Sequence, residues 1–441
     1  MTPATASRPS AIEDARPWGH TRRGRRHGTP APPRAPGTAL VFLALLAILA
    51  AAVPTAAQEY LPGPHPEWER RSPEETGFDA ARLQAAIDFA VASESATPRD
   101  LAEAHDLGFG REPRGEAVGP FRTRGAQTGL VIRGGYIVAA WGDPDRVDMT
   151  FSVTKTFLST TVGLAWDDGL IRDLDDPVGA YLPPVILPPG DGEPGDQDGL
   201  RPKELFASEH NRTITWDHLL RQTSDWEGTL WGKPEWADRP SGEPATWRTR
   251  ARHPAGTVYE YNDTRVNLLA LAALQLWRRP LPRVLKERVM DPIGASSLWR
   301  WHGYENSWVV LDGLHVQSVS GGGHWGGGMF LSAWDQARLG LLTLREGRWG
   351  EEEILSEAWM ERATTPTEAN PGYGFMNYFL NTGDEMYPAA PESAFAHRGA
   401  GANIVYVDRA NDLVVVTRWI RGSAFNEFIG MVLEALEGAE R

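Results

Sequence analysis

Segments with the apolar pattern of β-strands lie near both ends of this chain, and helical patterns fill the stretch between them. Residues 128–141 predict a hairpin that turns at Gly134 and Gly135, while residues 403–407 and 413–419 predict two further strands. Helical spacing of apolar residues marks other segments, at residues 78–93, 152–167, 215–222, 262–276, 333–345, 356–364 and 425–436. We therefore expect a mixed α/β (α+β) fold whose sheet is built from both chain ends, with a mainly helical insertion between them.

The chain is acidic and contains no cysteine. Its 441 residues carry a formal net charge of −14, and such a surface repels phosphate backbones, so we expect no nucleic-acid partner. The absence of cysteine excludes disulfides, thiolate metal sites and a cysteine nucleophile. Arginine supplies nearly all of the positive charge, and only four lysines occur: Lys155, Lys203, Lys233 and Lys286. Because lysine, unlike arginine, can be tuned to lose its proton, each of the four is a candidate functional group.

The first 57 residues have the layout of an export signal. An arginine-rich stretch precedes an apolar run at residues 39–53, and the small residues Thr55, Ala56 and Ala57 follow that run. The run is shorter than the ~20 residues that a membrane-spanning helix needs. We therefore predict a signal segment at residues 1–57 and one domain at residues 58–441, located in the periplasm or secreted. Membrane contact is expected only through an uncleaved N-terminal segment.

Ser152 and Lys155 form the sharpest chemical motif in the sequence. Residues three apart on a helix share one face, and the helix N-terminus favours negative charge that develops on a serine there. The apolar residues that follow predict a buried helix, and burial lowers the pKa of a lysine. Lys155 is therefore a candidate base for a Ser152 nucleophile. The alternative is a helix-capping serine beside a solvated lysine.

Signatures of several other enzyme classes are absent from the sequence. No G-x-S-x-G elbow, no H-E-x-x-H zinc motif and no phosphate loop ending in Gly-Lys-Ser/Thr occurs. The 11 histidines show no close metal-ligand spacing. The glycine-rich residues 321–328 are more typical of a close-packed turn than of a phosphate cradle. These absences disfavour an α/β-hydrolase in particular.

Further motifs follow Ser152 and Lys155 in a set order. Residues 213–224 resemble I-T-x-x-x-L-L-x-x-T-S, residues 256–269 resemble G-x-x-F-x-Y-S-N-x-x-x-x-L-L, and residues 327–340 resemble G-G-x-x-x-[ST]-x-x-D-x-A-R-x-G. His397-Arg398-Gly399 stands where K-T-G or H-T-G follows in the same pattern. Across residues 78–436 the chain thus resembles the serine β-lactamase-like hydrolases, which include class C β-lactamases, DD-peptidases, esterases and 6-aminohexanoate-dimer hydrolases. The resemblance implies a β-lactamase/transpeptidase-like fold, with an antiparallel sheet flanked by helices, a mainly helical subdomain and a cleft between them.

The resemblance also implies a mechanism. Ser152 attacks an ester or amide carbonyl and forms an acyl-enzyme, while Lys155 and Tyr261 share the proton transfers. The backbone N–H groups of Ser152 and Ala400 hold the oxyanion, and no metal or organic cofactor is implied. The K-T-G-like element contributes to substrate binding and corresponds here to His397, Arg398 and Gly399.

Three residues depart from the family pattern. Asp263 replaces an asparagine, and an ionised carboxylate accepts hydrogen bonds without donating any. Asp263 either contacts the substrate or holds Lys155 by charge, which would raise the lysine pKa. His397 and Arg398 replace the lysine and threonine of K-T-G. Arg398 either grips a carboxylate in a forked pair or points to solvent.

Aromatic residues leave further alternatives open. Tyr259 is a rival to Tyr261, although its position matches an aromatic packing site of the family. Trp226, Trp231 and Trp236 recur at five-residue spacing, which is not a helical stripe. Trp226 is a candidate wall of an apolar acyl pocket, and the alternative is that these tryptophans anchor a long loop. Two residues of the glycine-rich turn are further candidates for the cleft: His324 and Trp325.

These observations predict an exported serine hydrolase, similar to carboxylesterases and amidases, that acts on a small-molecule ester, amide or β-lactam. One alternative is a β-lactamase or DD-peptidase that acts on β-lactams or cell-wall peptides. The other is a non-catalytic cell-wall-binding or sensor protein.

Overall fold

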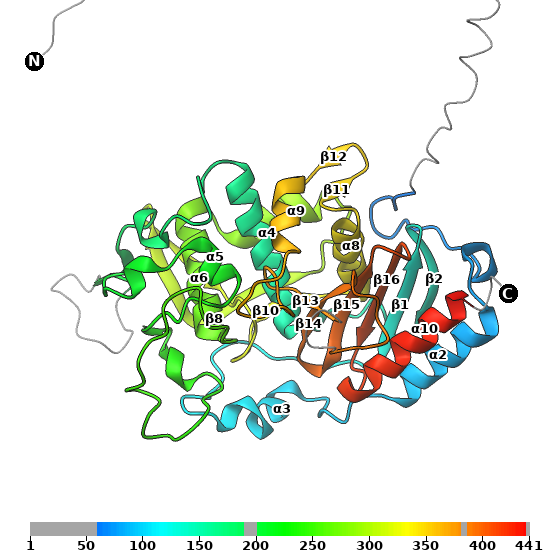
Figure 1. Cartoon of the computed structure of the whole chain (residues 1–441), viewed down its shortest axis with the longest axis horizontal. Coiled ribbons are helices and arrows are strands. Elements are labelled where there is room, and N and C mark those ends of the chain that lie inside the picture. Colours follow the sequence, from blue (N-terminus) through cyan, green and yellow to red (C-terminus); the bar gives the residue numbers. More distant parts are fainter. Residues whose placement is uncertain (1–59, 189–200, 381–385, 438–441) are drawn as a thin grey trace, which may run out of the picture. The chain divides into compact units, whose positions relative to one another are not determined.

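The computed structural model describes residues 60–188, 201–380 and 386–437. The predicted signal segment at residues 1–57 lies outside this described part. Figure 1 shows the sheet of the chain ends on one side, beside a larger region that contains α4, α5 and α6.

Six antiparallel strands form the main sheet, in the order β13-β14-β15-β16-β1-β2. The strands are β1 (Thr128–Arg133), β2 (Tyr136–Trp141), β13 (Tyr378–Phe379), β14 (Phe395–Gly399), β15 (Asn403–Asp408) and β16 (Leu413–Arg418). β1 pairs with β16 along its length, with Leu130 opposite Val416. Early and late segments of the chain therefore lie side by side in one sheet (Figure 1), which confirms the expected architecture.

Helices cover both faces of this sheet. α2 (Ala80–Ala92) and α10 (Phe425–Glu437) lie together on one face, where Val131 and Val415 join their apolar cluster (Figure 1). α8 (Ala333–Leu344) packs on the opposite face, where Leu130 and Val416 belong to a second cluster. Successive side chains of a strand point to opposite faces, so a sheet buried on both sides needs unbroken apolar runs in its strands. Residues 413–416, Leu-Val-Val-Val, are such a run.

The region between the two chain ends holds a second antiparallel sheet as well as helices. Its order is β3-β10-β8-β4-β5, and β9 also pairs with β8. The strands are β3 (Asp148–Met149), β4 (Val185–Leu187), β5 (Arg201–Lys203), β8 (Arg300–Leu311), β9 (Leu314–Val319) and β10 (Gly328–Leu331). The sequence did not predict this sheet, because β8 and β9, its longest strands, mix buried and exposed side chains without regular alternation.

Two helices at the centre of this region are buried along almost their whole length. They are α4 (Thr154–Asp167) and α6 (Asp263–Trp277), which pack against each other. The remaining elements are α3 (Leu101–Leu107), α5 (Trp216–Leu220), α7 (Leu281–Leu285) and α9 (Glu357–Ala363), with the short hairpins β6 (Thr229–Leu230) to β7 (Lys233–Pro234) and β11 (Arg348–Trp349) to β12 (Glu352–Glu353). A buried helix has to pair any charge that it carries. Lys155 of α4 and Asp263 of α6 are two such charges.

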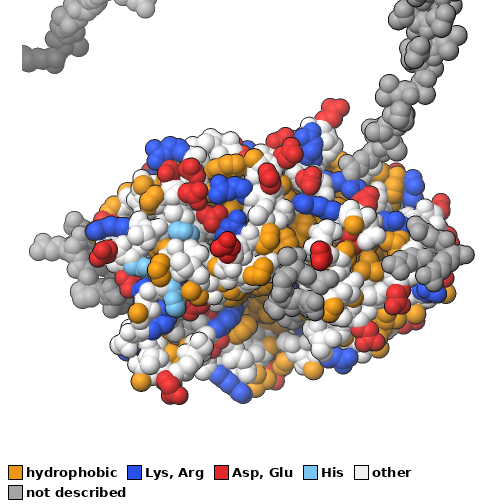
Figure 2. All heavy atoms as spheres, in the orientation of Figure 1, with side chains coloured by type: hydrophobic (Ala, Val, Ile, Leu, Met, Phe, Trp, Pro, Cys, Tyr) orange, Lys and Arg blue, Asp and Glu red, His pale blue; other side chains and the backbone are white. Residues whose placement is uncertain are grey.

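Within the described residues, we find no helix that is both long and apolar enough to cross a lipid bilayer. Side chains of both charge signs are interspersed over the face shown in Figure 2, with hydrophobic side chains between them. On this face the acidic excess is therefore spread out rather than gathered in one patch.

Gly340 lies where α8 packs on β15 and β16. A methyl group at this position would stand 2.7 Å from side-chain methyl groups of Val405 and Val414. We expect Gly340→Ala to push the helix and sheet apart and to lower the free energy of unfolding by about 1–3 kcal/mol, as overpacking of a core usually does. Thermal denaturation of the wild type and the variant measures this loss. Gly422→Ala is the control, because nothing lies within 4 Å of its added methyl group, and equal losses in both variants would contradict the close packing.

Candidate active site

Ser152 lies in a tight turn between β3 and α4. Residues Phe151–Val153 form a single 3-10 turn, which leads directly into the first turn of α4. Phe151 has a φ of +49°, which is rare and strained for a bulky residue. Hydrogen bonds pin both sides of the turn to β10, because the Thr150 N–H donates to the Met329 carbonyl and the Met329 N–H donates to Thr154 Oγ1. The Ser152 hydroxyl is thus presented by a rigid, strained turn at a helix N-terminus.

Lys155 reaches the Ser152 hydroxyl from the next turn of the chain. Its Nζ lies 3.1 Å from Ser152 Oγ and 2.8 Å from Asp263 Oδ1. The lysine is only 1% exposed, so the alternative of a solvated lysine does not hold. The i,i+3 spacing in the sequence therefore corresponds to a real contact in the fold.

Tyr261 completes a group of three side chains around Ser152. Lys155 Nζ lies 4.5 Å from the centre of the Tyr261 ring. Ser152 also acts to lower the pKa of Tyr261, which shows that the phenol lies near the serine hydroxyl. Both tyrosines pack on Tyr373, with 5.0 Å between ring centres for Tyr259 and 6.4 Å for Tyr261. Of the two tyrosines, Tyr261 is thus the one placed beside the nucleophile.

Burial shifts the pKa values of Lys155 and Tyr261 in opposite directions. Burial lowers the pKa of Lys155, and the carboxylate of Asp263 opposes this shift. Burial raises the pKa of Tyr261, and Asp263 raises it further. The phenol therefore keeps its proton more firmly than a free tyrosine does, while the ammonium of Lys155 gives up its proton more readily. This arrangement suits Lys155 as proton acceptor and Tyr261 as proton donor.

Asp263 lies between two cations. Its Oδ1 accepts from Lys155, and its Oδ2 accepts from Arg239 Nη1 at 2.8 Å. Burial alone would raise the pKa of Asp263, but the two cations hold it below its usual range. Of the two roles considered for Asp263, the structure shows the one in which it holds Lys155 by charge.

Gly399 brings the end of β14 against the Ser152 turn. A side-chain carbon at this position would stand 3.0 Å from the Ser152 backbone nitrogen and would collide with the Thr150 carbonyl. Only glycine allows the strand to approach so closely. Ala400 follows at once and starts a short 3-10 turn, so its backbone lies next to the turn that carries Ser152.

His397 and Trp226 do not reach this site, contrary to our expectation. His397 is 2% exposed and its Nε2 lies 3.2 Å from Thr343 Oγ1 of α8, because alternation along β14 turns this side chain towards the helix. Burial lowers the pKa of His397 to about 3, so the ring is neutral. Trp226 is also buried and donates its indole N–H to the Leu205 carbonyl, so it anchors its loop to the core.

Arg398 is half-buried, and its guanidinium lies over the rings of Tyr378 and Tyr387, 5.0 and 5.1 Å from their centres. It therefore does not extend freely into solvent. The ring of Tyr378 lies 6.4 Å from that of Tyr261, so a single aromatic ring separates Arg398 from the tyrosine beside Ser152.

Sequence reasoning missed a set of charged residues behind Asp263. His324 Nε2 lies 2.8 Å from Glu112 Oε2 and 3.6 Å from Asp238 Oδ1, and these three side chains have the spacing of metal ligands. Arg239, however, already forms an ion pair with Asp238, and its positive charge would repel a metal ion at that position. The group is better described as a hydrogen-bonded network that surrounds Arg239. The glycine-rich turn makes His324 a candidate for the cleft, but its contacts with Glu112 and Asp238 have no signal in the sequence, and nothing in the local pattern singles out Arg239.

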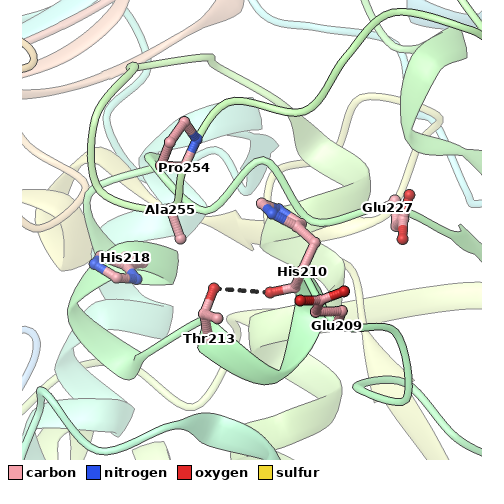
Figure 3. Close-up of a pocket in the computed structure, with 7 residues that line it drawn as sticks. All are labelled: Glu209, His210, Thr213, His218, Glu227, Pro254 and Ala255. Atoms are coloured by element: carbon pink, nitrogen blue, oxygen red, sulfur yellow. Dashed lines mark hydrogen bonds between the residues drawn. The ribbon is translucent and has the colours of Figure 1, made fainter.

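A large open cavity lies elsewhere on the molecule. Its lining residues are Glu209, His210, Thr213, His218, Glu227, Pro254 and Ala255 (Figure 3). None of the residues around Ser152 belongs to this lining. The ring of His218 accepts a hydrogen bond from the Thr215 N–H and so caps α5, while the Thr213 hydroxyl donates to the His210 carbonyl. These two contacts hold the local structure of the cavity wall.

Comparisons with known proteins give a consistent family. A family model described as Beta-lactamase matches residues 116–417, which is more than half of the chain. A 6-aminohexanoate-dimer hydrolase of Paenarthrobacter ureafaciens is 26% identical over 262 residues, which cover 57% of this chain and only 60% of that protein. A solved beta-lactamase from Mycobacterium bovis is 19% identical with a TM-score of 0.45, covering 70% of this chain and 94% of its own. A penicillin-binding protein homolog from Caulobacter crescentus is 14% identical with a TM-score of 0.49, covering 81% of this chain and 97% of its own.

Asp225 stabilises the loops that lead to α6 and hence the position of Tyr261. It follows α5 and forms ion pairs with Arg250 at 2.6 Å, Arg265 at 2.6 Å and Arg252 at 3.3 Å. Burial alone would raise the pKa of the Asp225 carboxyl, but Arg250 and Arg265 lower it to about 2. A carboxyl with a pKa below its unfolded value of about 4 stabilises the fold above that pH and loses this effect as the pH falls towards its folded pKa.

We therefore expect Asp225→Asn to lower the free energy of unfolding at neutral pH by about 2 kcal/mol, because one pKa unit corresponds to about 1.4 kcal/mol. The difference from the wild type should shrink as the pH falls from about 4 to about 2. Denaturant unfolding at a series of pH values measures it. Asp312→Asn, which breaks an exposed pair with Arg278, is the control and should change little. A difference that stays constant with pH would rule out this role of the Asp225 charge.

Proposed function

The chain belongs to the beta-lactamase family of hydrolases, and on that premise we propose that it cleaves ester or amide bonds through an acyl intermediate on Ser152. The observation that carries the proposal is the 3.1 Å contact between Lys155 Nζ and Ser152 Oγ, made by a lysine that is 1% exposed. A serine hydroxyl is a weak nucleophile unless a nearby base removes its proton. A buried lysine with a lowered pKa is such a base.

In the acylation step, neutral Lys155 accepts the Ser152 proton as Oγ bonds to the carbonyl carbon. The carbonyl oxygen becomes an oxyanion, which receives hydrogen bonds from the backbone N–H groups of Ser152 and Ala400. Tyr261 then protonates the departing alcohol or amine and regains a proton from the Lys155 ammonium. The products are an acyl-serine and one neutral leaving group, with every proton accounted for.

In the deacylation step, water attacks the acyl carbon and passes a proton to Lys155. Collapse of the second oxyanion breaks the bond to Ser152 Oγ, which takes the proton back from Lys155. The free acid leaves, and the resting site is restored. Neither step needs a metal or an organic cofactor.

Esters and linear amides suit this site better than β-lactams. Arg398 stands where the family threonine helps to bind the β-lactam carboxylate, but its guanidinium lies over the Tyr378 and Tyr387 rings. The likeness to a protein named 6-aminohexanoate-dimer hydrolase supports cleavage of a linear amide. Action on β-lactams or cell-wall peptides is the second candidate, which the family match supports.

We also propose that the enzyme works outside the cytoplasm, in the periplasm or after secretion. The basis is the arginine-rich stretch, apolar run and small residues of segment 1–57. Its substrates are small molecules rather than nucleic acids, because the formal net charge is −14. Any contact with a membrane is made by the N-terminal segment.

We expect Ser152→Ala to abolish turnover and labelling by a fluorophosphonate probe. Tyr261→Phe, which removes only the hydroxyl, should lower kcat by about 100- to 10,000-fold, as loss of a general acid does. Tyr259→Phe is the matched control and should lose far less. The measurement uses a panel of p-nitrophenyl esters, linear amides and β-lactams. Full turnover by Ser152→Ala would refute the mechanism, and a folded wild type that is never labelled but binds cell-wall fragments would support the non-catalytic alternative.

The charges around Lys155 should set the pH at which activity appears. Activity requires neutral Lys155, so kcat/KM should rise with pH as the ammonium loses its proton. Asp263→Asn removes the carboxylate that favours the ammonium, so the acidic limb should move to lower pH by roughly one to three units. Arg239→Gln removes a cation that disfavours the ammonium, so the limb should move to higher pH. The pH profiles of both variants test this, and shifts in the same direction would contradict the role of Lys155 as the base.

A further inference from the structure

A second cavity, of about 190 Å³, lies directly beside the nucleophile. Its walls come from α3 and the residues after it, from the residue before Ser152, and from the residues that follow β14 and β16. The wall residues that matter for its chemistry are Leu101, Ala104, Phe109, Phe151, Ala400 and Trp419. Phe151 precedes Ser152 in the chain, and Ala400 carries one of the two proposed oxyanion donors. The cavity therefore adjoins the place where the carbonyl group of a substrate sits.

The position of the proton donors decides which part of the substrate faces this cavity. The leaving group has to receive its proton from Tyr261 or Lys155, so it lies on the side of these two residues. Neither of them lines the cavity. The group that remains attached to the carbonyl carbon, and thus to Ser152 in the acyl-enzyme, is the one directed past Phe151 and Ala400.

The walls of the cavity are apolar, and their polar atoms mostly point elsewhere. Leu101 and Trp419 are 1% and 0% exposed, and the Trp419 indole N–H donates to Asp148 at 2.9 Å. His105 Nε2 donates to the Gly115 carbonyl at 2.7 Å, burial lowers the pKa of this histidine, and its Nδ1 is buried without a hydrogen-bond partner. No charged side chain belongs to the lining described for this cavity, so a charged group placed there would be desolvated without an opposite charge.

The size of the cavity limits its occupant. An apolar cavity of about 150 Å³ is large enough to bind benzene, so 190 Å³ accommodates a chain of about six carbons or a phenyl ring. Phe151 keeps a bulky ring at a backbone angle that favours glycine, and this ring packs edge-on against Trp419 with 6.4 Å between ring centres. A role for Phe151 as a wall accounts for an aromatic residue at so strained a position.

We propose that this cavity is the acyl-binding subsite and that it selects uncharged hydrocarbon acyl groups of about six carbons. The proposal rests on the acyl-serine function proposed above. It distinguishes a hexanoyl or benzoyl group, which fits, from a 6-aminohexanoyl group, whose ammonium would enter the largely apolar cavity without a carboxylate to pair with.

The test is a series of p-nitrophenyl acetate, butyrate, hexanoate, decanoate and 6-aminohexanoate, in which only the acyl group varies. We expect kcat/KM to rise about fourfold for each added methylene up to hexanoate, because each methylene becomes buried, and to fall at decanoate. The 6-aminohexanoate ester should react at least tenfold more slowly than the hexanoate. A second series of acetate esters with methyl to hexyl alcohols should show no such rise. A chain-length effect in the alcohol series alone, or equal rates for the charged and uncharged esters, would overturn the proposal.

A variant on α3 adds a test within the cavity. Ala104→Leu fills part of the space and should lower the ratio of kcat/KM for hexanoate over acetate by at least tenfold. Ala102→Leu on the exposed side of the same helix is the matched control and should leave that ratio unchanged. If Ser152 of the Ala104→Leu variant is still labelled and its chain-length preference is unaltered, the proposed acyl subsite is refuted while the proposed function stands. Absence of both labelling and turnover in the wild type would instead refute the proposed function.

Discussion

The Lys155–Asp263 ion pair is the interaction on which the rest of the structure depends. It joins α4 to α6 at 2.8 Å, in the interior, where neither charge has access to water. Arg239 binds the second oxygen of Asp263, so one carboxylate is shared by two cations. The asparagine of the family pattern could not balance the buried ammonium of Lys155, whereas the carboxylate of Asp263 can, and it also pairs with the half-buried Arg239. The aspartate also gives Arg239 a role at this site. By pairing with Asp263, Arg239 limits how strongly the carboxylate favours the protonated form of Lys155.

Parts of this arrangement follow from sequence periodicity, and others depend on tertiary packing. The Ser152–Lys155 contact was predictable because helical geometry alone places residues three apart on one face. The pairing of β1 with β16 was predictable because both strands carry the long apolar runs of a sheet buried on two faces. The second sheet was not predictable, because buried and exposed side chains alternate irregularly along β8 and β9. The role of Arg239 was not predictable either, because this residue lies in a segment without a periodic pattern. The direction of His397 depends on the register of β14, which a K-T-G-like motif does not reveal.

The cavity beside Ser152 connects the strained backbone of Phe151 with the proposed selection of the acyl group. Phe151 holds a left-handed conformation, and its ring closes one side of the space in which we place the acyl chain. α3, which forms another side, precedes the main sheet in the chain and belongs to a small apolar cluster with Phe151 and Trp419. Changes in α3 would therefore alter which acyl groups fit while the proton-transfer residues, Lys155 on α4 and Tyr261 just before α6, stay in place. α3 would thus contribute to the selection of the acyl group without supplying a proton-transfer residue.

The close approach at Gly399 also has a temporal consequence. The turn that carries Ser152 is synthesised well before β14 and the two strands that follow it, β15 and β16. A polypeptide that lacks β14 and the residues after it would contain Ser152 and Lys155 but not the backbone N–H of Ala400 that is proposed to stabilise the oxyanion. Such an incomplete product would lack the proposed oxyanion donor at Ala400, so the proposed hydrolysis would begin only after β14 has packed against the Ser152 turn.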